Sequence, residues 1–76
     1  MKIGDQILKA ALLQAKGQVE VHKTNILVYQ NMPAGIGEHS DVTEAVISEL
    51  DKLASANDRI DMLRYYFDIE DEHDFE

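Results

Sequence analysis

Two groups of polar residues in this sequence are of types that can do chemistry. The run Glu38-His39-Ser40-Asp41 brings a carboxylate, an imidazole and a hydroxyl within four positions, as a hydrolytic acid–base group or a cation site would. Adjacent residues do not converge on one reacting atom, however, and a serine followed by an aspartate is typical of a helix start. We therefore interpret Ser40 as a helix N-cap and not as a nucleophile.

The second group is the pair His22 and Glu49, which are far apart in the chain. On facing helices they could form half of a zinc or iron site that a second chain completes. Such carboxylate-bridged sites normally use acids from several helices together with a Glu and a His three residues apart, and neither residue has that companion. We favour a structural hydrogen-bonded pair and predict no catalytic, cofactor-binding or metal-binding residue.

Helices must position these groups. In the first segment, apolar residues and His22 recur at steps of four and three, which predicts a helix over about 4–31. The stretch 17–29 would also suit a strand, because it is rich in β-branched residues and begins with a glycine. The repeating positions are Leu8, Leu12, Ala15, Val19, His22, Ile26 and Tyr29.

A turn and a second helix follow. Pro33, with Gly35 and Gly37, predicts a turn over 32–40, since proline cannot continue a helix and disfavours it in the preceding residue. The same spacing then predicts a helix over about 41–67. Its repeating positions are Val42, Val46, Glu49, Leu53, Ala56, Ile60, Leu63 and Phe67.

Residues 68–76 carry six carboxylates and are predicted to form a disordered acidic tail. The tail lacks the spaced ligands and central glycine of a helical-hand calcium loop, so specific calcium binding is not expected. It either keeps the protein in solution or mimics nucleic-acid charge and docks on a basic host protein. Deleting the tail separates these two alternatives, because only mimicry predicts the loss of such a partner.

The two apolar stripes predict an all-α fold, an antiparallel two-helix hairpin. Pairing residues equally distant from the turn places Ala15 level with Ala56, and His22 level with Glu49. Either polar residue alone would weaken the seam, whereas together they satisfy each other. Several outward apolar residues are left uncovered, which predicts a homodimer, a four-helix bundle. The interface candidates are Val21, Leu27, Val28, Ile47 and Met62.

Composition limits the classes of function. The 76 residues include 15 acidic and 7 basic side chains, a formal net charge of −8, and no cysteine. Such a charge argues against direct binding to nucleic-acid phosphates, and no apolar run approaches the roughly 20 residues of a membrane span. We expect a soluble, cytoplasmic protein without cofactors.

Part of the sequence resembles known proteins. A lysine- and valine-containing helix leads into Asn31-Met32-Pro33-Ala34-Gly35-Ile36-Gly37-Glu38-His39-Ser40-Asp41, and Glu44-Ala45 and Glu49-Leu50-Asp51-Lys52-Leu53-Ala54 follow. Over about residues 18–67 this order resembles small helical proteins of tailed bacteriophages, including phages of marine cyanobacteria. In those proteins proline usually follows the asparagine directly, whereas here Met32 intervenes. The resemblance implies a phage-encoded accessory protein in the host cytoplasm and carries over no catalytic residue.

The sequence therefore predicts a non-enzymatic helical interaction protein that acts through self-association and an unidentified protein partner. The alternative is an acidic inhibitor or nucleic-acid mimic directed at a host protein. A small metal-dependent enzyme is the third possibility.

Overall fold

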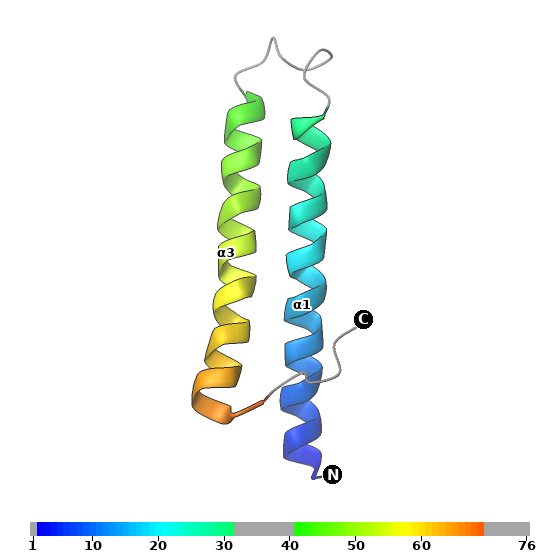
Figure 1. Cartoon of the computed structure of the whole chain (residues 1–76), viewed down its shortest axis with the longest axis vertical. Coiled ribbons are helices and arrows are strands. Elements are labelled where there is room, and N and C mark those ends of the chain that lie inside the picture. The colour runs from blue at the N-terminus through cyan, green and yellow to red at the C-terminus, as the bar shows by residue number, and fades with distance from the viewer. Residues whose placement is uncertain (1, 32–40, 70–76) are drawn as a thin grey trace.

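Two long helices make up nearly all of the described part of the protein. The computed structural model describes residues 2–31 and 41–69, in which α1 spans Ile3–Gln30 and α3 spans Asp41–Phe67. The helices lie side by side and run in opposite directions (Figure 1), and the described residues include no strand. The prediction of an all-α fold with two packed helices is thus confirmed.

The ends of α1 differ by one residue from the predicted 4–31. The helix is continuous through 17–29, where the sequence also suited a strand. It ends at Gln30, and Asn31 then caps it: the Asn31 backbone N–H and side-chain amide donate to the carbonyl of Leu27 at 3.1 and 2.8 Å. These bonds satisfy carbonyl groups that the last turn of a helix leaves without partners.

The predicted bounds of the second helix, 41–67, agree with those of α3. Asp41 and Glu44 lie in its first turn, where the helix dipole favours negative charge. Ser40, Pro33, Gly35 and Gly37, together with the rest of the predicted turn over 32–40, lie outside the described residues.

The core lies in the half of the hairpin that is farther from the turn (Figure 1). Its buried residues are Leu12 and Ala15 of α1 with Ala56, Ile60 and Leu63 of α3. Nearer the turn, the side chains between the helices, such as Ile26 and Val46, are only half-buried. Two helices alone therefore bury one half of their contact well and leave the other half partly open to solvent.

The structure describes the first two residues of the predicted tail, Asp68 and Ile69. Asp68 adopts a left-handed backbone conformation with φ 58°, and its N–H donates to the carbonyl of Arg64. This is an αL helix cap, in which an aspartate replaces the usual glycine. The cap turns Ile69 back onto the core, with its N–H bonded to the carbonyl of Leu63. Residues 70–76 lie outside the described part of the chain.

Candidate functional site

A polar layer crosses the seam between the helices. His22 Nδ1 lies 2.6 Å from Glu49 Oε1, and the Asn25 side-chain amide donates to the same oxygen at 3.0 Å. Because a carboxylate only accepts, the Nδ1 atom of His22 must carry the shared proton. Both members of the pair have side chains only 15% exposed. The structure thus brings together the two residues that sequence pairing placed at one level.

Asn25 is the member of this layer that the sequence analysis missed. It lies three residues after His22, so the two share one side of α1 within a single turn, and this spacing is the signal that pointed to it. Its amide donates to Glu49 without adding charge. The layer therefore contains one carboxylate with two donors, which is a stabilised anion and not a set of converging acid and base groups.

Hydrogen bonding shifts the titration of Glu49. Donation from Asn25, followed by donation from His22, holds the pKa of the Glu49 carboxyl below its ordinary value of 4.5, and nearby Lys52 acts in the same direction. Partial burial opposes the shift but does not outweigh these contacts. The charged form of Glu49 is therefore favoured in the folded protein.

Glu49→Gln is expected to make the free energy of unfolding less sensitive to acid. Because the folded pKa is lowered, the carboxylate stabilises the fold fully above the ordinary value of 4.5, and this contribution disappears as the pH falls through the folded pKa. Urea midpoints at about pH 6 and about pH 3 would measure the loss in parent and variant. Equal losses of stability between the two pH values in parent and variant would contradict the lowered pKa of Glu49.

A double-mutant cycle is expected to show that His22 and Glu49 act as a unit. His22→Leu and Glu49→Leu should each lower stability, because the surviving polar group loses its partner within the seam. The double change to leucine should recover much of the loss, since two apolar residues then face each other. Denaturant midpoints of the four proteins give the coupling free energy between the two side chains. Strictly additive single effects would mean that the two side chains do not meet in solution.

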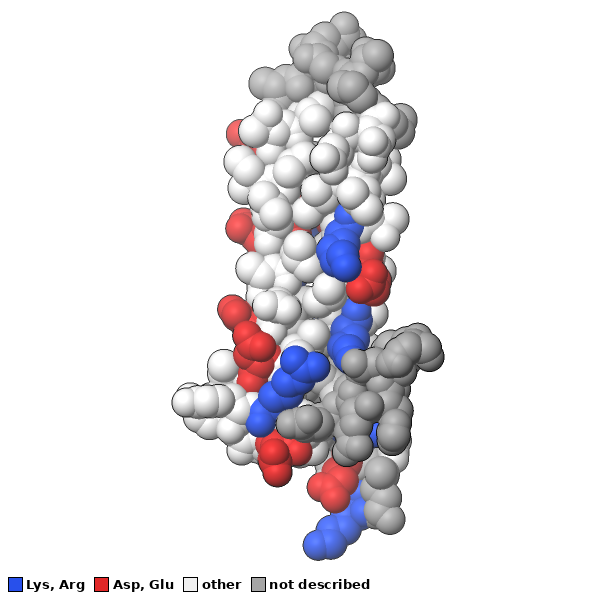
Figure 2. Space-filling model, viewed as in Figure 1, with Lys and Arg blue, Asp and Glu red and all other residues white. Residues whose placement is uncertain are grey.

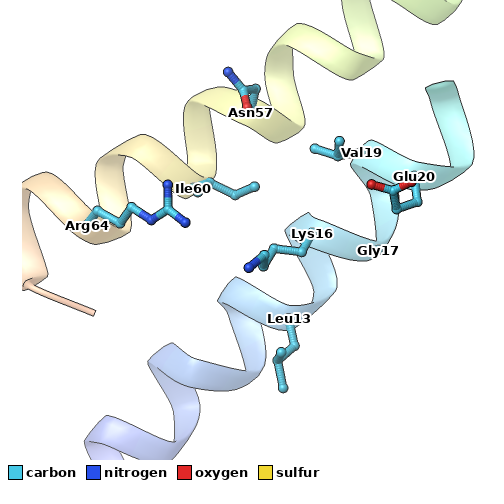
Figure 3. A pocket seen from close by; sticks show the side chains of 8 residues that line it. All are labelled: Leu13, Lys16, Gly17, Val19, Glu20, Asn57, Ile60 and Arg64. Carbon is cyan, nitrogen blue, oxygen red and sulfur yellow. The ribbon is translucent and has the colours of Figure 1, made fainter. Parts of the chain in front are cut away.

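The helices also form a groove on one flank. It is lined by Leu13, Lys16, Gly17, Val19 and Glu20 of α1 and by Asn57, Ile60 and Arg64 of α3. Figure 3 shows Val19 and Ile60 directed into the gap between the helices, with Leu13 directed away from α3. We name this side the Leu13 flank. Its polar groups are mixed in charge and do not converge on one point, so the groove suits contact with a surface more than chemistry on a small molecule.

The opposite side is a second groove, which we name the Met62 flank. Ala11 and Gln14 of α1 and Ser55, Arg59 and Met62 of α3 contribute to its lining. Arg59 bridges the two helices here, donating to Gln18 and to Ser55.

Four of the five interface candidates divide between the two flanks. All five are about half-exposed, with fractions from 45% to 53%. Val21 and Val28 follow Gln14 at steps of seven, which places them toward the Met62 flank, whereas Leu27 follows Leu13 by fourteen residues. Ile47 lies between Glu44 and Asp51 at steps of three and four, and so belongs to the outer side of α3. No single flat surface contains all five.

Charged side chains are also unevenly distributed. On the face seen in Figure 2, lysine, arginine and acidic side chains gather over the lower part of the molecule, and the part nearer the turn is almost uncharged. The sequence accounts for this, since residues 24–31 carry no charge. The apolar side chains Leu27, Ile47 and Leu50 lie at this end and are each about half-exposed.

Neither helix of the described ranges combines the length and apolarity that crossing a membrane requires. Within the same ranges, no group of three or more His, Asp or Glu side chains is placed to hold a metal ion.

Comparison with protein-family models, with curated proteins and with solved structures finds no match for this chain.

Proposed function

We propose that this protein is a non-enzymatic helical interaction protein that acts through self-association and through binding of a protein partner. The observation that carries the proposal is the uncovered apolar surface on both flanks of the hairpin, including Val21 at 53% and Leu27 at 51% exposure. Contiguous exposed apolar surface marks interaction sites in proteins that are otherwise folded. Two such flanks allow one to bind a second copy and the other to bind a different protein.

Surface area supports the proposal. The chain exposes 5791 Å², whereas a compact monomer of its 8.6 kDa mass exposes about 4,700 Å². The excess is comparable to the roughly 800 Å² that each partner buries in a standard interface. The radius of gyration points the same way, at 15.9 Å against about 11 Å for a compact domain of this length.

A homodimer of hairpins, a four-helix bundle, is the assembly that fits best. Two-fold pairing is the commonest closed arrangement and requires only that one surface match itself. The resemblance of residues 18–67 to small proteins of tailed phages supports a phage-encoded accessory role in a host cell. The same resemblance offers no catalytic residue, in keeping with a protein that works through its surfaces.

Sedimentation equilibrium of the full chain at micromolar concentration tests the proposal. The expected result is a mass of twice the 8.6 kDa of one chain. Because association stabilises the folded state by mass action, the thermal midpoint should also rise with protein concentration. A monomer throughout, with a midpoint independent of concentration, would contradict the four-helix assembly.

A second candidate function, mimicry of nucleic-acid charge, is favoured by the outer side of α3. Glu44 and Asp51, seven residues apart, are exposed on the side of α3 turned away from α1, and Asp58 continues this line of acidic residues at the edge of the Met62 flank. A line of carboxylates in a chain of net charge −8 is a surface that a basic, DNA-binding host protein could contact. Competition with DNA tests this function: the parent should displace DNA from such a protein, and Asp51→Asn with Asp58→Asn should displace less.

A further inference from the structure

An uncharged stripe runs along the whole length of α1 on the side that does not face α3. It starts at Ile3 and continues by steps of four and three to Val28, and every residue in it is exposed. The seam residues of α1 repeat with the same period, so the two stripes keep a constant angular separation along the helix. The stripe repeats every seven residues, which is the period of helices that pack in pairs, and its large apolar members are Ile3, Ile7, Val21 and Val28.

The charges of α1 avoid this stripe. With about 100° of rotation per residue, all of the charged residues of α1 and its preceding residue fall within an arc of about 60°. They are Lys2, Asp5, Lys9, Lys16, Glu20 and Lys23. Charged side chains are depleted at the centre of protein interfaces and retained at the rim, which is the distribution seen here.

Gly17 lies within the stripe and also borders the groove of the Leu13 flank. A Cβ atom added at this position would meet nothing within 4 Å. Glycine destabilises the interior of a helix relative to alanine, so its presence in the middle of α1 calls for a different reason. Close approach of another helix is one such reason, because glycine leaves room for a neighbouring side chain.

We propose that the stripe of α1 packs against the stripe of α1 from a second copy, with the two helices antiparallel. The inference rests on the proposed self-association and specifies the surface that carries it. Pairing positions whose numbers add to 31 brings Ile7 level with Thr24, Ala10 level with Val21, and Gln14 level with Gly17 of the other copy. Each level then joins a larger side chain to a smaller one, which is how facing helices interdigitate.

The charges favour α1 over α3 as the central helix. The outer side of α3 carries Glu44 and Asp51, with Asp58 at its edge, and these would face their own copies or each other in a two-fold contact through that helix. Like charges placed opposite one another oppose association. The α1 stripe itself carries no charge, so it meets its copy without this repulsion. Asp58, which lines the Met62 flank together with Gln14, borders the contact, and the lysine-rich arc remains outside it.

A pair of matched substitutions locates the interface. Val21→Glu places a charge in the stripe, and Leu27→Glu places the same charge on the Leu13 flank at nearly equal exposure, 53% against 51%. Burial of an unpaired carboxylate should weaken dimerisation of Val21→Glu by roughly 30-fold or more, whereas Leu27→Glu should change it by less than about threefold. Both side chains are exposed in the hairpin, so circular dichroism should show unchanged helix content.

Gly17→Leu provides a second, independent variant. A Cβ atom at this position meets no atom of its own hairpin within 4 Å, and leucine favours a helix, so the helix content should stay the same or increase. In the proposed contact the leucine would occupy the room that Gln14 of the other copy requires. Dimerisation should therefore weaken although the helix itself is strengthened.

The antiparallel orientation is tested with a single spin label. The chain has no cysteine, so Lys2→Cys provides one labelling site outside the stripe. In the antiparallel register the two labels lie about 40 Å apart along the helix axes, whereas parallel helices would bring them within about 20 Å. Pulsed electron paramagnetic resonance measures this separation.

The outcomes distinguish this inference from the proposed function. If the parent is a dimer but Leu27→Glu dissociates it and Val21→Glu does not, self-association stands and the α1 stripe is the wrong surface. A short label separation overturns the antiparallel register. If the parent is a monomer, both the self-association and the stripe contact are wrong.

Discussion

Leu12→Ala is expected to unfold much of the protein and to lower its stability more than any other single substitution proposed for this chain. Leu12 has no exposed surface and sits in the cluster with Ala15, Ile60 and Leu63. Truncating a buried leucine to alanine costs about 2–5 kcal/mol, since apolar contacts are lost and a cavity remains. A folded chain of 76 residues has in total only about 4–11 kcal/mol of stability.

Leu13→Ala is the matched control for this experiment. The neighbouring leucine loses the same atoms in the same helix, but it is 41% exposed and is turned away from α3. Thermal unfolding followed by circular dichroism should show a large fall in midpoint for Leu12→Ala and a small one for Leu13→Ala. Similar falls would mean that α1 does not present Leu12 to α3 in solution.

Ala56→Leu is expected to destabilise the hairpin by about 1–3 kcal/mol, because a well-packed core resists added methylene groups. Ala56 and Ala15 are both 0% exposed, and the register set by the polar layer places them at one level, where two small side chains allow the helices to approach closely. A leucine at this level must push the helices apart or adopt a strained rotamer. The separation would in turn weaken the contacts of Leu12 and Ile60 nearby.

Ala54→Leu separates crowding from the intrinsic effect of leucine on a helix. Ala54 is exposed on the same helix two residues earlier, so the added side chain extends into solvent. Urea midpoints should fall for Ala56→Leu and stay close to the parent value for Ala54→Leu. A neutral result for Ala56→Leu would show that the seam is wider at this level than the structure has it.

The sequence alone was sufficient to predict the two helices and the register in which they pair. Steps of four and three define one face of a helix wherever they occur, so the apolar stripes of both segments can be found without knowing the fold. A short connection then forces an antiparallel arrangement, and equal distance from the turn sets the register. For this reason the sequence by itself pairs His22 with Glu49 and Ala15 with Ala56.

Local signals were weaker where two conformations have similar propensities. Residues 17–29 suited both a helix and a strand, and the structure makes them helical because Val19, His22 and Ile26 then continue the face that packs on α3. The αL cap at Asp68 could not be predicted from the sequence, because no glycine marks it. Aspartate adopts this conformation only when the surrounding contacts favour it. Here the packing of Ile69 against the core favours it.

Only the tertiary structure decided how burial and exposure are distributed. Spacing identifies which residues lie outside the seam, but the position of the second helix determines which groove each of them borders. It separates Gln14, with Val21 and Val28 in line with it, from Leu13, with Leu27 in line with it. The third member of the polar layer, Asn25, likewise needed the position of Glu49 across the seam. The physical reason is that periodicity fixes the direction of a side chain relative to its own helix, whereas contact depends on what the other helix places there.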